Sequence, residues 1–262
     1  MKSRLITFFS EVYSYRQVLY QLVTQQLILR YRRTALGYLW TLINPLLMMS
    51  VMAVVFSTLF KVELKTFAIL LFAGMVPWNF FSSVVAQTGA SFINNEGLIK
   101  KIYLPKAIFP LSVVIALFID SLLSFVALFA IILTIGGTVS WSVLFVSYAY
   151  IILFVLSFGI SLIVSVATVY FRDLQYIVGI AMQGLFFLTP ILYKKDSLVG
   201  KLSFLVKINP LTPFIDLFRS PIYLGTLPPI ATIMSSFIIS ISFLAVGLVI
   251  FICHEKKLVF RL

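Results

Sequence analysis

The side chains that could carry out catalysis in this chain are few and scattered. Eight acidic residues stand at positions 11, 63, 96, 120, 173, 196, 216 and 255, and no two of them are three or four residues apart. A single cysteine, Cys253, and a single histidine, His254, exclude a disulfide framework and a cysteine–histidine metal centre. Metal motifs such as HExxH are absent as well. The sequence therefore argues against an active site built from these groups.

A nucleotide-binding P-loop is also missing. The nearest fragment, Gly200-Lys201-Leu202, lacks the upstream glycine of the G-x-x-x-x-G-K-[ST] motif and the hydroxyl residue that follows its lysine. We therefore expect no cofactor on this chain. If ATP and Mg²⁺ drive its work, another polypeptide must bind them.

One acid, Asp120, lies near the middle of a long apolar stretch. An ionised acid at the centre of a membrane helix costs about 2.5–3.5 kcal/mol on insertion scales. It is either part of a proton or ion relay, or a polar link to hydroxyl groups such as Ser121, Ser124 or serines on a neighbouring helix. We favour the polar link, because the sequence offers no second buried acid or base to receive a proton.

The composition is that of a membrane protein with several spans. Hydrophobic residues make up 61% of the 262 residues and charged residues 11%, against about 45–50% and about 25% in soluble domains. Apolar stretches long enough to cross a hydrocarbon core of about 30 Å recur along the chain. They predict an all-α integral membrane fold, a single transmembrane domain over residues 1–262. We expect six spans, at about 36–60, 67–88, 108–134, 142–170, 174–193 and 229–253, with a break in the second at Gly74–Pro77 and a turn at Gly136-Gly137 after the third.

The basic residues orient these spans. With both termini in the cytoplasm, 13 of the 20 Lys and Arg residues lie on the cytoplasmic side and 7 on the outer side, which favours this topology. The net charge of +12 then reflects cationic loops near anionic lipid head groups rather than nucleic-acid binding.

Two segments outside the spans have helical patterns of their own. Residues 1–33 place Leu19, Leu22, Val23 and Leu27 on one helical face, which predicts an amphipathic helix at the cytoplasmic membrane interface. A helix packed in a small soluble subdomain is the alternative. Residues 194–228 combine apolar runs with prolines at 210, 213 and 221, so we expect short half-helices that re-enter the outer leaflet there.

Four segments, taken in order, resemble one family: the membrane subunits, or permeases, of ABC transporters that export O-antigen, capsular polysaccharide or teichoic acid. The segments are RYRRTALGYLW with NPL (30–40 and 44–46), NNEGLIKKIYLP (94–105), YFRDL with FFLTPILY (170–174 and 186–193), and NPLTPF with FR (209–214 and 218–219). The resemblance covers essentially the whole chain, with the four segments in the same order as in the family.

The resemblance implies a role for several of these residues. Residues 91–106 look like the cytoplasmic coupling helix of the family, with Asn94 and Asn95 at its start, Glu96 in its first turn and Lys100 and Lys101 near its end, before Pro105. This charge order also matches the helix dipole. The alternative is that the segment is only a connector between two spans. The basic residues Arg30, Arg32 and Arg33 either bind the head group of a lipid carrier or only anchor the first span on the cytoplasmic side.

The resemblance further implies a homodimer with two copies of a separate ABC ATPase subunit and a pathway lined by the first and fifth spans. Aromatic rings suit such a pathway, because they cover the apolar faces of sugars without adding charge. The channel-lining candidates, taken as a group, are Tyr38, Trp40, Phe56, Phe60, Phe186, Phe187 and Tyr193; for each ring alone, ordinary packing is the alternative. The resemblance also implies that residues 194–228 form the external gate region.

The implied cargo is a lipid-linked polysaccharide, with an O-antigen on a polyprenyl diphosphate carrier as the first choice, moved across the bacterial cytoplasmic (inner) membrane. Exporters of teichoic acid, of capsule, or of a smaller lipid or drug remain open, and so does an integral-membrane enzyme of glycolipid synthesis. The scattered acids weigh against the enzyme. A neighbouring gene for a P-loop ATPase, beside glycosyltransferase genes, would favour the polysaccharide exporter.

Overall fold

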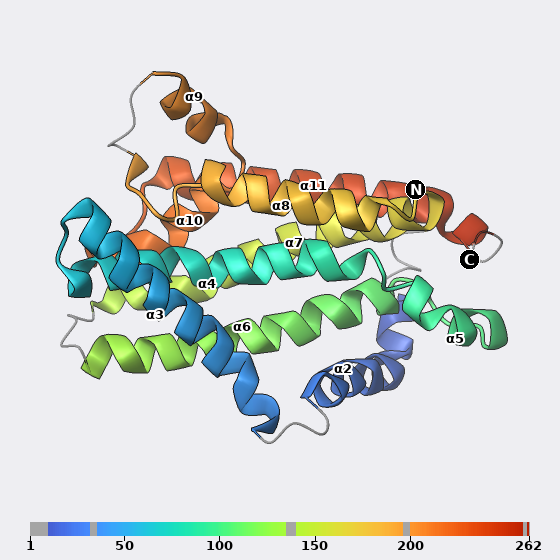
Figure 1. Ribbon diagram of the computed structural model, residues 1–262. Helices are drawn as coiled ribbons and strands as arrows, with labels where there is room; N and C mark the ends of the chain where they lie inside the picture. Colours follow the sequence, from blue (N-terminus) through green and yellow to red (C-terminus); the bar gives the residue numbers. More distant parts are fainter. Residues whose placement is uncertain (1–9, 32–35, 135–139, 196–199, 259–260, 262) are drawn as a thin grey trace.

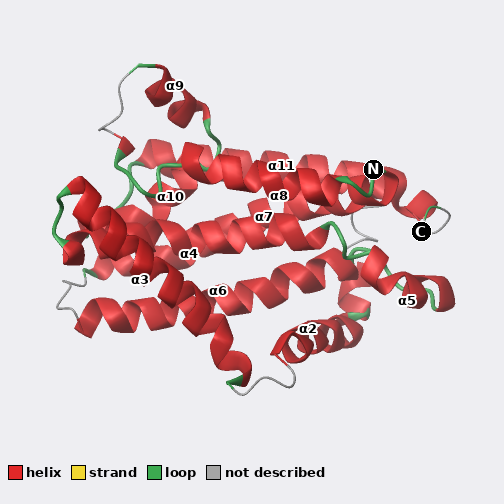
Figure 2. Ribbon diagram, viewed as in Figure 1, coloured by secondary structure: helices red, strands yellow, loops and turns green. Residues whose placement is uncertain are grey.

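The computed structural model describes residues 10–31, 36–134, 140–195, 200–258 and 261 and arranges them as a bundle of helices (Figure 1). These residues contain no strand (Figure 2). The main helices are α2 (Arg16–Tyr31), α3 (Trp40–Phe60), α4 (Leu64–Thr88), α5 (Glu96–Lys101), α6 (Ile108–Thr134), α7 (Val146–Tyr170), α8 (Leu174–Leu188), α9 (Lys201–Ile208), α10 (Thr212–Arg219) and α11 (Ile230–Leu258). Short turns of helix precede or follow several of them: η1 (Gly37–Leu39), η2 (Ile93–Asn95), η3 (Trp141–Phe145) and η5 (Ser220–Leu224). The predicted all-α class is confirmed.

Five helical segments among the described residues are long and apolar enough to cross a membrane. They are Gly37–Phe60, Leu64–Thr88, Ile108–Thr134, Trp141–Tyr170 and Ile230–Leu258, and they match the predicted spans one, two, three, four and six. The predicted turn at Gly136-Gly137 lies outside the described residues.

The predicted fifth span, 174–193, is shorter than expected. Its helix, α8, has 15 residues, which at 1.5 Å per residue is about 22 Å. The helix ends at Leu188 because Thr189 precedes Pro190, and a residue before proline is pushed from the helical into the extended region. The hydropathy pattern overestimated this helix, since residues 189–193 are apolar but not helical.

Helix α4 lies at the centre of the bundle. In its most apolar window 78% of the residues are buried, against 17% in the corresponding window of η1 and α3. The predicted break at Gly74–Pro77 is wrong, because α4 runs through Pro77 without interruption. Proline removes one backbone hydrogen bond, but the adjacent rings of Trp78, Phe80 and Phe81 are buried against neighbouring helices. Tertiary packing of this kind holds a proline inside a membrane helix.

A second apolar core ties together the end of the bundle that carries α5. It joins α2 to residues 92–109 and to the last turns of α11 through Leu22, Phe92, Ile99, Phe109 and Phe251. The helix expected within 1–33 is confirmed over Arg16–Tyr31. One of its sides is buried at Leu22 and Val23, and the helix packs on α6 of the bundle rather than in a separate soluble subdomain. Tyr20, Ile28 and Leu29 on other sides are exposed.

At the opposite end, the segment after α8 divides into two unlike parts. Helix α10 belongs to the main core, where Phe214, Leu217 and Phe218 are almost completely buried. Helix α9 stands apart from the bundle at the upper left of Figure 1 and buries only Val206. Short helices are therefore present in 194–228, and α10 is part of the main core.

Candidate functional site

The predicted coupling segment forms a short helix at the end of the bundle, α5 in Figure 1. The Lys100 ammonium group lies 2.6 Å from a carboxylate oxygen of Glu96, one turn earlier. The hydrogen bond and the charge of Lys100 lower the pKa of the Glu96 carboxyl group. Lys101, the last helical residue, is exposed. The charges therefore sit where the helix dipole favours them, acid first and bases last.

The predicted cap of this helix is formed differently. Asn95 occupies the residue before the helix, but its side chain makes no cap. Its amide instead donates back to the carbonyl oxygen of Ser91 at 2.8 Å. The asparagine thus stabilises the turn between α4 and α5, and the helix start is held by the backbone of η2.

Apolar side chains divide α5 into an anchored side and an exposed side. Ile99 and Leu104 are buried in the second core. Leu98, Ile102 and Tyr103 point outward, with Tyr103 71% exposed. A hollow of about 210 Å³ is lined by residues 99–104 and 106. This end of the molecule presents a fixed surface with both apolar and basic groups.

The candidate rings of the first span form two groups. Phe56 and Phe60 stack at 5.8 Å near the end of α3, and Phe60 also contacts Phe67 of α4. Tyr38 and Trp40 lie at the start of the span, where Trp40 is 39% exposed. These four rings are therefore spread along the whole length of α3.

The candidate rings after α7 gather at the end of α8. Phe186 contacts Phe187 and also Trp78 of α4, with centroids 5.3 and 5.6 Å apart. The Tyr193 hydroxyl group donates to the Phe187 carbonyl oxygen at 2.9 Å. Phe187 itself is 66% exposed.

The two ring groups do not meet within one chain. Among the described residues no ring pair joins α3 to α8, and α4 contacts both helices. In Figure 1, α8 runs alongside α4 and α3 crosses α4 obliquely. No residue of α8 is fully buried. The candidate rings thus line two flanks of α4 and do not enclose a channel by themselves.

The basic cluster lies largely beyond what the structure describes. Arg30 belongs to the last turn of α2. Arg32 and Arg33 fall outside the described residues, so their proposed role stays a prediction.

A buried arginine that sequence reasoning missed joins two of the resembling segments. Arg219, 7% exposed, donates hydrogen bonds to the carbonyl oxygens of Ile191 and Tyr193, the latter at 3.2 Å. Nearby, the Asn209 amide donates to the Thr189 hydroxyl oxygen at 2.9 Å. The side chains of Asn209 and Arg219 in the NPLTPF…FR segment therefore bind the non-helical turn that ends the FFLTPILY segment.

Asp120 forms an interhelical link, as predicted, but with a different partner. The Tyr38 hydroxyl group donates to a carboxylate oxygen of Asp120 and so ties the start of the first span to the middle of α6. Ser124 donates to the backbone carbonyl of Asp120 at 2.9 Å, and Ser121 bonds to Tyr150. The expected serine partners thus do not bind the carboxylate.

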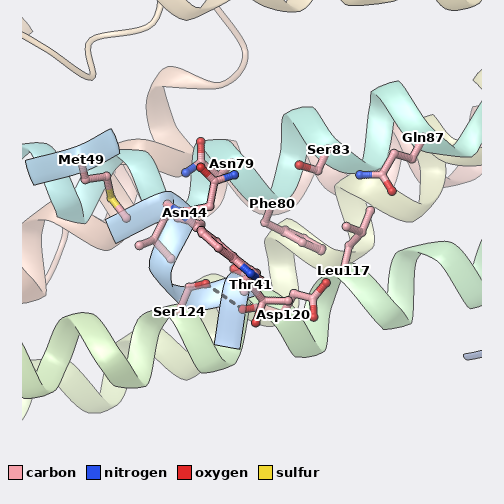
Figure 3. A pocket seen from close by; sticks show the side chains of 14 residues that line it. Thr41, Asn44, Met49, Asn79, Phe80, Ser83, Gln87, Leu117, Asp120 and Ser124 are labelled. Atoms are coloured by element: carbon pink, nitrogen blue, oxygen red, sulfur yellow. Dashed lines mark hydrogen bonds between the residues drawn. The ribbon is translucent and has the colours of Figure 1, made fainter. Parts of the chain in front are cut away.

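A polar cavity of about 290 Å³ adjoins this link, between α3, α4 and α6 (Figure 3). Its lining combines one carboxylate, three carboxamides, hydroxyl groups and apolar side chains: Trp40, Thr41, Asn44, Pro45, Met49, Val76, Asn79, Phe80, Ser83, Gln87, Leu117, Asp120, Ser121 and Ser124. No lysine, arginine or histidine is among these described lining residues.

Comparison with known proteins agrees with this architecture. The family model described as "ABC-2 type transporter" matches residues 17–223. An O-antigen export system permease protein, RfbA, of Klebsiella pneumoniae is 31% identical over 210 residues, which cover 79% of this chain and 80% of that protein. RfbA of Myxococcus xanthus is 28% identical over 233 residues, covering 88% and 90%. The polysialic acid transport protein KpsM of Escherichia coli is 22% identical over 236 residues, covering 87% and 90%. The chain belongs to the ABC-2 type transporter family.

Proposed function

We propose that this chain is the membrane subunit of an ABC exporter that moves a lipid-linked polysaccharide across the bacterial cytoplasmic membrane. The similarity to O-antigen export permeases along most of the chain supports an O-antigen on a polyprenyl diphosphate carrier as the cargo. The weaker similarity to a polysialic acid transport protein supports a capsular polysaccharide as the second candidate.

The observation that carries this proposal is the exposure of α3 and α8. Both helices are apolar, carry the candidate rings and flank α4, yet the α3 window is 17% buried and α8 has no fully buried residue. A second copy placed across this face forms an isologous dimer and encloses the rings in a shared pathway. Aromatic walls then contact sugar faces without fixing the polymer in one register.

Two copies of a separate ABC ATPase dock at the end of the bundle that carries α5. These partners bind the ATP and Mg²⁺. The exposed side of α5, with Lys100, Lys101 and Tyr103, forms the contact, and the outer side of α2 adds to it. Because Ile99 anchors α5 in the second core, movement of the ATPase is passed to α6, α2 and α11 together.

In this arrangement both termini are cytoplasmic. The last turn of α11 carries Lys256 and Lys257 at the same end as α5, in keeping with the positive-inside rule. Helix α8 together with residues 189–193 makes the fifth crossing, which brings the number of crossings to six. Helices α9 and α10 belong to the external gate region, with α10 re-entering the outer leaflet.

The carrier lipid reaches the pathway at the start of the first span. Its diphosphate binds there to Arg30, Arg32 and Arg33, because one guanidinium group can donate to two phosphate oxygens at once.

A reconstituted system tests this function. The chain and its ATPase are placed in proteoliposomes that contain a polyprenyl diphosphate-linked oligosaccharide, and ATP is added outside. We expect the oligosaccharide to become protected from an added glycosidase only when ATP is hydrolysed. No ATP-dependent protection would refute the proposal. Equal ATP-driven transfer of a sugar-free phospholipid would favour a smaller-cargo exporter.

A further inference from the structure

The cavity between α3, α4 and α6 lies halfway along the bundle, and Trp40 is the one candidate ring among the described residues that line it. Its position follows from Asp120, which is near the middle of the 27-residue helix α6. Figure 3 shows Asn79, Ser83 and Gln87 of α4 along one wall and Asp120 of α6 opposite. Exposed Asn44 and Trp40 from α3 stand at its rim. The cavity therefore opens beside α3.

The chemistry of the lining selects among possible ligands. A diphosphate is disfavoured, because Asp120 is anionic or a neutral acid and no cationic side chain lines the cavity among the described residues. A bare metal ion is also a poor fit, since hard cations seek several charged oxygens and one carboxylate is present.

A neutral ring with many hydroxyl groups fits better. The carboxamides of Asn44 and Asn79 make no hydrogen bond to another described residue, so both donors and acceptors are available on the cavity wall. Phe80, Leu117 and Val76 supply an apolar wall for the flat face of such a ring. Small-molecule sites combine an apolar lining with a few polar groups in this way, in volumes of about 300–1,000 Å³.

A second cavity extends the polar surface toward α5. It measures about 620 Å³ and is lined in part by Gln25 and Gln26 of α2 and by Asn94 and Asn95 beside α5. Gln87 lines both cavities. Carboxamides and hydroxyls therefore continue from the proposed cytoplasmic end to the middle of the bundle, along one protomer.

We propose that the cavity between α3, α4 and α6 is a sugar-binding subsite that holds a neutral pyranose of the cargo beside the pathway. The inference rests on the proposed function, which supplies a lipid-linked glycan. The subsite lies within each protomer and recognises hydroxyl groups, whereas the exposed rings contact the polymer without a hydrogen-bond pattern. Asp120, held by Tyr38, and the amides of Asn44 and Asn79 are its specificity-determining groups.

The test compares two probes on the complete permease–ATPase complex in lipid nanodiscs. One probe is a polyprenyl diphosphate bearing a single N-acetylglucosamine, and the other is the same diphosphate without sugar. We expect wild type to bind the first more tightly. Asn79→Leu and Asp120→Asn should each weaken binding of the sugar-bearing probe about ten-fold, as expected for one lost hydrogen bond, and leave the sugar-free probe unchanged.

Two further variants separate an effect on sugar binding from an effect on folding. Asn44→Leu changes an exposed rim residue, so folding is least at risk there. Gln21→Leu, an exposed carboxamide on α2 outside both cavities, serves as the matched control and should bind both probes like wild type.

The outcomes separate the subsite from the export function. If wild type binds neither probe, the proposed function fails and the subsite with it. If wild type prefers the sugar-bearing probe and all three cavity variants retain that preference, the subsite is wrong while the export proposal stands. If the cavity variants weaken the binding of both probes equally, the subsite is also wrong, because the substitutions would then affect carrier binding or folding rather than sugar binding.

Discussion

Gly247 of α11 lies directly on the backbone of Gly159 of α7. A Cβ atom at Gly247 would stand 2.3 Å from the Gly159 carbonyl oxygen, and one at Gly159 would stand 2.6 Å from the Leu244 nitrogen. Only a residue without a side chain permits this approach. Near the crossing, the Ser240 hydroxyl group donates to the Ile152 carbonyl oxygen at 3.0 Å. Small residues and polar links of this kind hold membrane helices together.

Alanine at this crossing should therefore loosen the bundle. We expect Gly159→Ala or Gly247→Ala to lower stability by about 1–3 kcal/mol, the usual cost of overpacking, because neither backbone can yield without moving a helix. Gly179→Ala is the matched control, since a Cβ there meets no atom within 4 Å. Thermal unfolding of the purified protein in detergent measures the difference. An unchanged midpoint for both crossing variants would contradict the close packing.

The coupling surface makes a second prediction. The triple variant Glu96→Ala, Lys100→Ala and Lys101→Ala should insert normally but bind the ATPase at least about five-fold more weakly, through the loss of charged contacts at the interface. Stability should barely change, because the Glu96–Lys100 pair is exposed. Co-purification of the ATPase with the tagged permease measures the effect.

A charge-matched control lies at the other end of the bundle. Lys61, Glu63 and Lys65 are exposed at the turn between α3 and α4. Changing these three residues to alanine should leave ATPase binding intact. Unchanged co-purification and unchanged export in the α5 triple variant would show that α5 is only a connector.

The buried arginine makes a third prediction. Arg219→Met removes the donors to the Ile191 and Tyr193 carbonyl oxygens. We expect a loss of at least about 2 kcal/mol, because each unsatisfied buried polar group costs about 1–3 kcal/mol. Arg172→Met, at an exposed arginine after α7, is the control. Equal melting temperatures for the two variants would mean that Arg219 does not hold the turn after α8.

The head-group role of the basic cluster is tested by changes that keep its charge. Arg30→Lys, Arg32→Lys and Arg33→Lys preserve the positive charge that sets topology, but lysine cannot bind two phosphate oxygens in the planar, paired geometry of a guanidinium group. We expect the triple lysine variant to insert correctly and to export less polysaccharide. Normal export by this variant would mean that the cluster only anchors the first span on the cytoplasmic side.

The sequence predicted those parts of the fold that depend on local composition. Hydropathy located the five long helices, and the family resemblance, supported by the charge order, located α5. Contacts between distant segments were missed, because one sequence does not reveal them. Tyr38 lies 82 positions from Asp120, and Arg219 lies 28 positions from Ile191. The arginine resembled a surface charge in a proline-rich loop, whereas it satisfies carbonyl oxygens in the non-helical turn after α8.

The sequence predicted the effect of two prolines on helix continuity wrongly, one as a break and one as no break. Pro77 was expected to break α4, yet packing on all sides keeps that helix whole. Pro190 was expected to lie within a span, yet it ends the less buried α8. Burial by neighbouring helices distinguishes the two cases, and the sequence alone does not report it.

The central proposal is that the candidate rings on α3 and at the end of α8 line the pathway. Trp40, Phe60 and Phe187 are exposed, whereas Phe56, Phe186 and Tyr193 are half-buried against the main core. A combined variant tests this proposal: Trp40→Ala, Phe56→Ala, Phe186→Ala and Tyr193→Ala. It should assemble with its ATPase but lower surface polysaccharide about ten-fold, because aromatic contacts with the polymer are lost. It should also raise the resting ion conductance of the membrane, because the apolar constriction that excludes water is removed. Trp141→Ala with Phe237→Ala, at exposed rings outside both rows, should leave both quantities unchanged. The decisive measurement is surface polysaccharide and conductance in the same cells. Reduced export with increased leak supports the pathway, and normal values for both in the four-ring variant would contradict it.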